Sequence, residues 1–250
     1  MAGSKVKDQL LSTAMDAVRR GERLARSYLM AELVLREQDI QQTIVVFGST
    51  RITELTQSPP DGQPDYYRVA REFGALVGRS GRGPADCRLT LVTGGGPGIM
   101  EAANRGASEV GAKSIGLTIK LPREQLPNKY VSEELRFNFR YFAIRKLHFL
   151  IRAKALVVFP GGFGTLDELF ETLNLVETGV IAPLPIVLIG EEFWRRAFDL
   201  EFLAGRGVIG AGGLKLFWYS ETAAEAWNSI IQWHRHAGTP LLCDLEAPAK

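Results

Sequence analysis

The amino-acid sequence predicts an α/β protein with a Rossmann-like, doubly wound parallel sheet, built as a single domain with an N-terminal helical extension. Two observations carry this prediction. Short apolar runs alternate with longer stretches of helical periodicity along the chain, which is typical of parallel strands covered by helices on both faces. Two of the apolar runs also end in glycine-rich loops, as expected at the ligand-binding edge of such a sheet.

Strands are expected where a short apolar run is bounded by turn residues or follows a helical stretch. These runs lie at Ile44–Phe47, Leu89–Thr93, Ser114–Thr118, Ala155–Phe159, Pro185–Ile189 and Leu216–Tyr219. Helical periodicity separates them, at 66–79, 99 to about 110, about 141 to 153, 165 to about 178, 191 to about 203, and 221–236. The stretches 53–64 and 119–140 contain prolines and charges and are predicted to be loops.

The first forty residues alternate charged and apolar residues near helical spacing and contain no proline, which predicts one or two amphipathic helices. We therefore divide the chain into this extension at 1–40, the Rossmann-like domain at 41–236, and a C-terminal tail at 237–250. The apolar periodicity of the extension predicts that it packs on the domain or across a dimer.

The composition limits the possible functions. The 250 residues are 46% hydrophobic and 23% charged, with a net charge of +2, so no bulk field attracts nucleic acid or membrane. The apolar runs are far shorter than the roughly 20 residues of a membrane helix, and no secretory signal is visible at the start, so we expect a cytoplasmic protein. Two distant cysteines and three histidines predict neither a disulfide framework nor a metal site.

The first glycine loop, Thr93–Met100, follows a strand and opens a helix. It resembles a dinucleotide fingerprint, but the next strand runs into Thr118-Ile119-Lys120 without the acidic residue that would hold a ribose hydroxyl. A dehydrogenase is therefore disfavoured, and a tight structural turn is an equal alternative. The segment Gly106–Ser114 is similar to a P-loop, but it has one residue too many and leads from helix into strand.

The second glycine loop reads Phe159-Pro-Gly-Gly-Phe-Gly-Thr-Leu-Asp-Glu168. Its glycines can open a backbone cradle for a phosphate at the start of the following helix, and Thr165 can add a hydroxyl donor. Thr165 and Glu168 also have the spacing of a capping box, in which each side chain bonds the other residue's backbone amide. Spacing alone favours this structural role for Glu168 over a catalytic one.

A basic stretch precedes the second loop. Between positions 136 and 154 there are no acidic residues, several aromatics and six basic residues, namely Arg136, Arg140, Arg145, Lys146, Arg152 and Lys154. The stretch could bind nucleic acid, form a solvated helix face, or supply cations to a small phosphorylated ligand. Because its helix leads into the strand before the second loop, we expect part of it to overlook that loop.

Together these segments resemble the LOG ("lonely guy") family of nucleotide phosphoribohydrolases, formerly called lysine decarboxylases. The resemblance rests on the pattern PGGxGTxxE at 160–168, on Arg145-Lys146 and on the first loop, and covers roughly 43–203. It implies cleavage of the N-glycosidic bond of a nucleoside 5′-monophosphate, either a cytokinin ribotide or an AMP-like nucleotide, and a homodimer or higher homo-oligomer. No lysine stands out as the pyridoxal-phosphate lysine of a decarboxylase, and no cofactor is expected.

The resemblance also assigns roles to residues. It implies that Arg145 and Glu168 are catalytic and that Gly161, Gly162, Gly164 and Thr165 hold the phosphate. A carboxylate at position 168 can stabilise an oxocarbenium-like transition state and deprotonate water, while a guanidinium can neutralise charge on the departing base. We expect a smaller contribution from Lys146 and a nucleoside lining formed by Ser49, Gly95 and Gly96.

Two other interpretations stay open. Proteins similar to molybdenum-cofactor carriers share this architecture and bind their ligand without cleaving it. Binding of nucleic acid through residues 136–154 is the second, and it predicts a steep loss of affinity with salt. We expect neither nucleic acid nor membrane as a partner.

Overall fold

The computed structural model describes residues 2–54, 64–80, 89–120, 126–210, 212–239 and 241. Its centre is one seven-stranded sheet in which all pairs of neighbouring strands are parallel. The strands are β1 (Gln42–Phe47), β2 (Leu89–Thr93), β3 (Ser114–Ile119), β4 (Arg136–Phe139), β5 (Ala153–Val158), β6 (Ile186–Ile189) and β7 (Trp218–Ser220). Every residue of β2 and β6 is buried, which explains why such strands are continuous apolar runs in the sequence.

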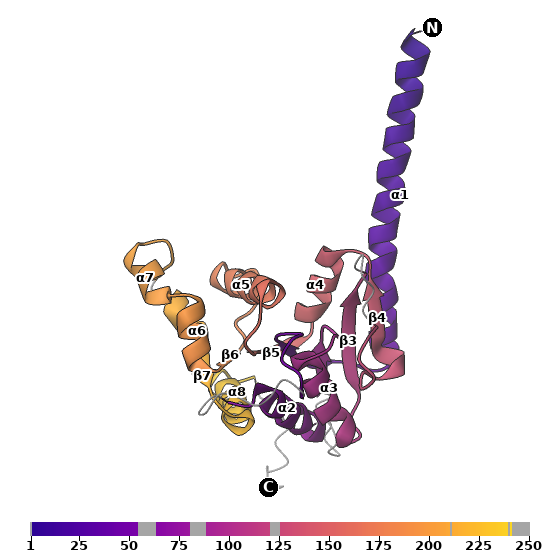
Figure 1. Ribbon diagram of the computed structural model, residues 1–250. Helices are drawn as coiled ribbons and strands as arrows, with labels where there is room; N and C mark the ends of the chain where they lie inside the picture. The colour runs from indigo at the N-terminus through magenta and orange to yellow at the C-terminus, as the bar shows by residue number, and fades with distance from the viewer. Residues whose placement is uncertain are drawn as a thin grey trace, which may run out of the picture.

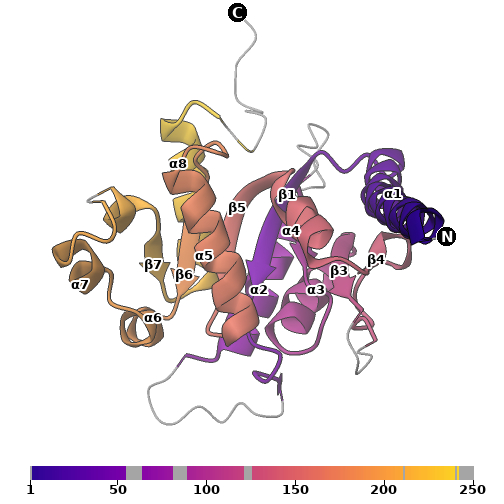
Figure 2. The same cartoon turned by 90° about the horizontal axis from the view of Figure 1, so that it is seen from above.

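Helices cover both faces of the sheet (Figures 1 and 2). One hydrophobic cluster joins the sheet to α2 (Tyr66–Ser80), α3 (Ile99–Glu109) and α8 (Ala223–His236). The second cluster joins the opposite face to α4 (Phe142–Leu150), α5 (Phe163–Glu177), α6 (Glu191–Ala197) and the end of α1 (Ala2–Glu37). The predicted Rossmann-like fold is therefore confirmed. The short helix α7 (Leu200–Gly205) follows α6.

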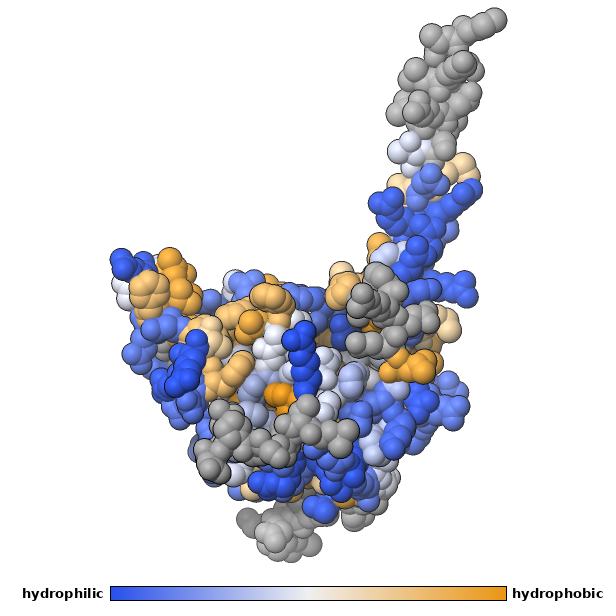
Figure 3. Space-filling model, in the orientation of Figure 1, coloured by the Kyte–Doolittle hydropathy of each residue, from blue (hydrophilic) through white to orange (hydrophobic). Residues whose placement is uncertain are grey.

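The N-terminal extension is a single helix. Its last turns pack on the domain through the buried Ala31 and Leu35, and Glu32 forms an ion pair with Arg152 at 2.8 Å. The rest of α1 extends away from the body of the protein (Figures 1 and 3). The expected boundary at residue 40 falls in the short turn between α1 and β1, and α8 ends at residue 236.

Two predicted segments differ from the structure. Residues 136–139, expected in a loop, form β4 at the edge of the sheet, where Arg136 and Asn138 are exposed. An edge strand this short has no continuous apolar run, so its sequence does not distinguish it from a charged loop. The helix expected at 191–203 is two helices, because the Asp199 side chain accepts a hydrogen bond from the Phe202 amide at 2.9 Å and starts α7. Most of the expected loop at 53–64 lies outside the described residues.

The strand order β4-β3-β2-β1-β5-β6-β7 reverses direction between β1 and β5. The chain leaves these two neighbouring strands toward opposite faces, which opens a crevice at their carboxyl ends. Along the described part of the chain, no helix combines the length and apolar character needed to cross a membrane.

Candidate active site

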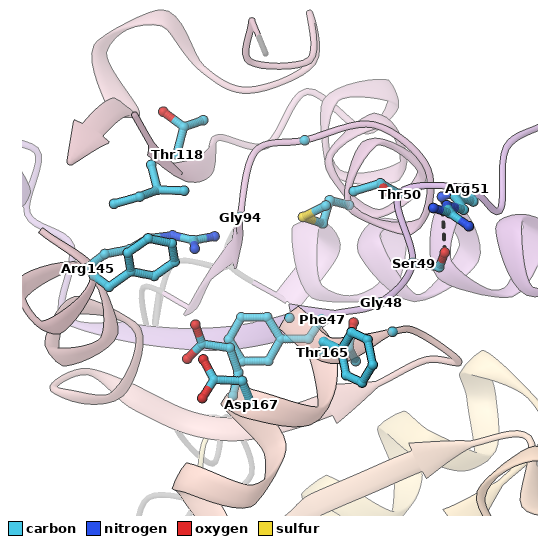
Figure 4. Close-up of a pocket in the computed structure, with 18 of the residues that line it drawn as sticks. Phe47, Gly48, Ser49, Thr50, Arg51, Gly94, Thr118, Arg145, Thr165 and Asp167 are labelled. Atoms are coloured by element: carbon cyan, nitrogen blue, oxygen red, sulfur yellow. Dashed lines mark hydrogen bonds between the residues drawn. The ribbon is translucent and has the colours of Figure 1, made fainter. Parts of the chain in front are cut away.

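A cavity of about 630 Å³ occupies this crevice (Figure 4). The loops after β1, β2, β3 and β5 form its walls together with α4 and the first turns of α5. The lining residues are Phe47, Gly48, Ser49, Thr50, Arg51, Gly94, Gly96, Met100, Thr118, Ile119, Leu126, Phe142, Arg145, Gly162, Phe163, Gly164, Thr165, Asp167 and Glu168. The carboxyl ends of four parallel strands thus meet at one site, which is where this architecture binds ligands.

The start of α5 forms one end of the cavity. Gly162 is the N-cap, and its carbonyl accepts the first helical hydrogen bonds, from the amides of Thr165 (2.9 Å) and Leu166 (3.0 Å). The amides of Phe163 and Gly164 precede these bonds, so they have no partner within the helix and point toward its N-terminal end. Such a helix start favours an anion.

The glycines of this loop have different roles. Gly162 and Gly164 are exposed and line the cavity, whereas Gly161 does not line it. A Cβ atom on Gly161 would overlap the Thr165 side chain. Gly161 is therefore needed for close packing against the helix start, while Gly162 and Gly164 face the space where an anion would lie.

Thr165 and Glu168 do not form the capping box that their spacing allows. The helix begins two residues before Thr165, and its N-cap makes no side-chain hydrogen bond. The capping-box interpretation of Glu168 is therefore wrong. The same spacing does give a capping box at α8, where Thr222 and Glu225 exchange both hydrogen bonds at 3.2 Å.

Glu168 lies on α5, is only 7% exposed and lines the cavity. Burial raises the pKa of its carboxyl group from the ordinary 4.5 to about 7. The positive charges of Lys146 and Arg145 oppose this rise, while the carboxylates of Glu171 and Asp167 add to it. Near neutral pH this group can therefore both hold and accept a proton.

Arg145 reaches the same cavity from α4. Its Nε–H donates to the Leu117 carbonyl at 2.7 Å, and its guanidinium lies 5.1 Å from the centre of the Phe149 ring. A Cβ atom on Gly94 would lie 2.8 Å from Nη2 of Arg145, so the missing side chain at Gly94 gives the guanidinium its room. Burial lowers the pKa of Arg145, and the negative charges of Glu168 and Asp167 only partly offset this effect.

Arg145 and Glu168 therefore face one cavity from two different helices. Figure 4 shows Arg145 reaching toward Gly94 on one side, with Thr165 and Asp167 on the other. The charge of Glu168 acts on Arg145, and that of Arg145 on Glu168. The sequence pattern alone could not predict that Arg145 and Glu168 lie close together, because their proximity arises from the packing of α4 and α5 on the sheet.

Lys146 does not line the cavity. Its ammonium group forms ion pairs with Asp167 Oδ2 at 2.9 Å and Glu171 Oε2 at 2.8 Å, which links α4 to α5. Burial by itself lowers the pKa of Lys146, but the two paired carboxylates outweigh this effect and raise the pKa above its ordinary value. Lys146 is thus turned toward α5 rather than toward the space where a nucleotide was expected.

Of the three residues expected to line the nucleoside, two line the cavity and one does not. Ser49 and Gly96 line the cavity, and Ser49 Oγ accepts a hydrogen bond from the Arg51 amide at 3.0 Å. Gly95 does not line it. The Gly95 amide donates to Thr93 Oγ1 at 2.9 Å, and its carbonyl accepts from the Asn128 amide at 2.8 Å. The polar groups of Gly95 are therefore used to hold the loop.

Several lining residues were not anticipated. Arg51 is a second arginine among the lining residues, and its position directly after the small residues that follow β1 was the signal available in the sequence. Phe142, Ile119 and Leu126 form an apolar wall, and Phe163 at the start of α5 is 92% exposed. Nothing in the local pattern distinguishes these apolar residues from ordinary core positions.

The described residues contain no group of three or more histidine, cysteine, aspartate or glutamate side chains that could hold a metal ion. Both cysteines lie outside these residues. The buried His234 has a structural role, because its ring nitrogens lie 3.0 Å from Thr239 Oγ1 and 2.8 Å from the Lys154 carbonyl.

Comparison with known proteins agrees with the motifs at this site. A family model described as "Possible lysine decarboxylase" matches residues 100–230, just over half of the chain. The chain belongs to this family, the LOG family. It is 28% identical over 137 residues to the cytokinin riboside 5′-monophosphate phosphoribohydrolase LOG7 of Arabidopsis thaliana. That match covers 52% of this LOG-family chain and 57% of the relative, so it spans little more than half of the relative's length.

Solved structures support the same fold. The X-ray structure of TM1055 is 22% identical with a TM-score of 0.53, covering 76% of this chain and 99% of that one. The molybdenum cofactor binding protein of Rippkaea orientalis is 19% identical with a TM-score of 0.52, and the match covers 77% of this chain and 96% of that one. The Moco carrier protein of Chlamydomonas reinhardtii is 22% identical with a TM-score of 0.52, and the match covers 78% of this chain and 99% of that one. At these identities the likeness concerns the fold alone.

Proposed function

We propose that this LOG-family protein hydrolyses the N-glycosidic bond of a nucleoside 5′-monophosphate, releasing the free base and ribose 5-phosphate. The observation that carries the proposal is the cavity that Arg145 and Glu168 both face, with the N-terminus of α5 at its edge. The phosphoribohydrolase named among the relatives supports the same class of reaction.

The 5′-phosphate would bind at the start of α5, where the amides of Phe163 and Gly164 and the hydroxyl of Thr165 are available as donors. Anchoring the phosphate there places the sugar beside Glu168, further along the same helix. Binding energy from the phosphate is then used to position the bond that breaks.

Glu168 would act on C1′ of the ribose. As the C1′–N bond breaks, its electron pair leaves with the base and positive charge develops on the sugar, which an ionised carboxylate stabilises. Glu168 then accepts a proton from the attacking water, whose oxygen bonds to C1′, and this proton can pass on to the departing base. A carboxyl group with a pKa of about 7 can both accept and release this proton near neutral pH.

Arg145 would act on the leaving base. Its hydrogen bond to Leu117 and its packing on Phe149 fix the guanidinium before substrate binds. A fixed cation stabilises the negative charge that develops on the base without donating a proton, because arginine stays protonated.

The base would lie against the wall formed by Ile119, Leu126 and Phe142. Phe142 is one turn before Arg145 on α4, and Ile119 lies two residues after Leu117 on β3. All three side chains are apolar, so this wall favours a base that carries an apolar substituent over unmodified adenine. A cytokinin ribotide is thus the proposed substrate, with AMP as the alternative.

The test is to incubate the purified protein with isopentenyladenine ribotide and with AMP and to measure released base by chromatography. Glu168→Gln is expected to keep nucleotide binding and to lower kcat by at least about 100-fold. Glu177→Gln, at the exposed end of the same helix, serves as the matched control and should keep normal turnover. Retained turnover in Glu168→Gln would exclude the mechanism.

A binding protein without catalysis is the second candidate. The fold is shared with solved molybdenum-cofactor binding and carrier proteins, and the glycine-rich loops of this cavity could hold a phosphorylated ligand without cleaving it. Tight binding of nucleotide or molybdenum cofactor, with no base released by the wild-type protein, would favour this function over hydrolysis.

A further inference from the structure

Lys146 lies beside the proposed catalytic pair and forms ion pairs with two carboxylates of α5. Its side chain is 17% exposed, and its ammonium group lies 2.9 Å from Asp167 Oδ2 and 2.8 Å from Glu171 Oε2. On α5, Asp167 immediately precedes Glu168, and Glu171 follows it by about one turn. One cation is therefore held between the two carboxylates that flank the proposed catalytic carboxyl group.

Lys146 is also adjacent in sequence to Arg145. Neighbouring residues on a helix point in directions about 100° apart, so α4 can present Arg145 to the cavity and Lys146 to α5. The backbones of α4 and α5 do not pack as a close pair in the way that α2 and α3 do. The two ion pairs of Lys146 thus bridge two helices that the cavity partly separates, one carrying Arg145 and the other Glu168.

The charges around Glu168 come from both helices. Arg145 and Lys146 face it from α4, while Asp167 and Glu171 lie beside it on α5. Of the two cations, Lys146 has the larger effect in favour of the ionised carboxylate, against the cost of burial. Without Lys146, the carboxylates of Asp167 and Glu171 would lose their shared counterion, and both would repel a charge on Glu168.

We propose that Lys146 is a positioning residue: its two ion pairs tie α4 to α5 and neutralise the carboxylates on either side of Glu168, which favours the ionised form of Glu168. Its consequence for turnover rests on the hydrolase function proposed above. Its effect on the charge of Glu168 does not depend on that function, because this effect exists in the protein without substrate. Lys146 needs no contact with the nucleotide for either role.

The first experiment measures Glu168 directly in the full chain. Glutamate labelled with ¹³C at the carboxyl carbon is titrated by NMR, and the Glu168 signal is identified by its absence from Glu168→Gln. Lys146→Met should raise the midpoint of this titration by about one pH unit. Lys146→Arg, which can keep both ion pairs, should leave it near the wild-type value.

Two further variants test the charge balance. Asp167→Asn combined with Glu171→Gln keeps Lys146 but removes both carboxylates, so the midpoint should fall below that of the wild type. This variant also keeps the proposal testable if Lys146→Met does not fold. Lys113→Met, which removes a more exposed lysine paired with Glu134 at 2.8 Å, is the matched control and should not move the midpoint.

The second experiment measures base release as a function of pH. A midpoint that moves from about 7 to about 8 lowers the ionised fraction of Glu168 at pH 7 roughly fivefold. Lys146→Met should therefore show kcat about fivefold lower at pH 7, with recovery near pH 9. A Lys146→Met titration midpoint equal to the wild type, or a loss of kcat that is the same at every pH, would overturn the proposal. If the wild-type protein releases no base, the hydrolase function fails while the NMR titration still decides the role of Lys146.

Discussion

Glu168 should make the folded protein less stable as the pH rises. Its pKa in the folded state is about 7, raised from 4.5 by burial. Between these two values the unfolded chain ionises this carboxyl group while the folded protein keeps it protonated, so the unfolded state becomes favoured. The contribution of this protonated carboxyl group to the stability of the folded state is complete below pH 4.5, declines as the pH rises, and is lost above pH 7.

The size of the effect follows from this shift. A rise in pKa from 4.5 to about 7 corresponds to about 3 kcal/mol in total, most of which falls between pH 5 and pH 8. Glu168→Gln removes the ionisation. The free energy of unfolding of this variant minus that of the wild type should therefore be larger at pH 8 than at pH 5, by about 2–3 kcal/mol.

Denaturant unfolding of both proteins at the two pH values measures this quantity without any substrate. Glu177→Gln, on the exposed end of α5, is the control and should change the free energy of unfolding by the same small amount at both pH values. If the difference between Glu168→Gln and the wild type is equal at pH 5 and pH 8, the account of a buried carboxyl group with a raised pKa is wrong.

Three further predictions concern packing, catalysis and assembly. Gly161→Ala should destabilise the fold by about 1–3 kcal/mol, because its Cβ overlaps Thr165. Gly164→Ala, whose Cβ meets open space, is the control and should have a thermal unfolding midpoint close to that of the wild type. Arg145→Lys keeps the charge but loses the hydrogen bond to Leu117, so kcat/KM for base release should fall at least about tenfold, and an unchanged value would contradict a fixed guanidinium. We also propose that the protein self-associates, since α1 exposes large apolar side chains; light scattering should give a mass above the 27.6 kDa of one chain, and a smaller assembly is expected when serine replaces Val18, Leu29 and Leu33.

Local chemistry explains why the architecture could be predicted. A strand buried on both faces must be apolar along its whole length, as in β2 and β6, and this leaves a signal in the sequence at short range. The exceptions lie where burial is incomplete. β4 is a short edge strand with exposed residues, and the break before α7 depends on one capping side chain, Asp199.

The sequence also determined where the two glycine loops that border the cavity would lie. Glycine-rich segments that follow buried strands and open helices can lie only at the carboxyl edge of a parallel sheet, and the cavity is at that edge. The pattern could not determine what each residue does there. Thr165-x-x-Glu168 and Thr222-x-x-Glu225 have the same spacing, yet only the second pair forms a capping box, because α5 starts three residues earlier than the motif suggests.

Only the tertiary structure decided which side chains meet. Arg145 and Lys146 are neighbours in sequence, but the packing of α4 directs one into the cavity and the other onto Asp167 and Glu171. The raised pKa of Glu168 likewise arises from burial and from charges on a second helix. The strands and loops were encoded locally, by apolarity and by glycine, whereas the electrostatics of the site depend on distances between residues on α4 and α5 that no local pattern contains.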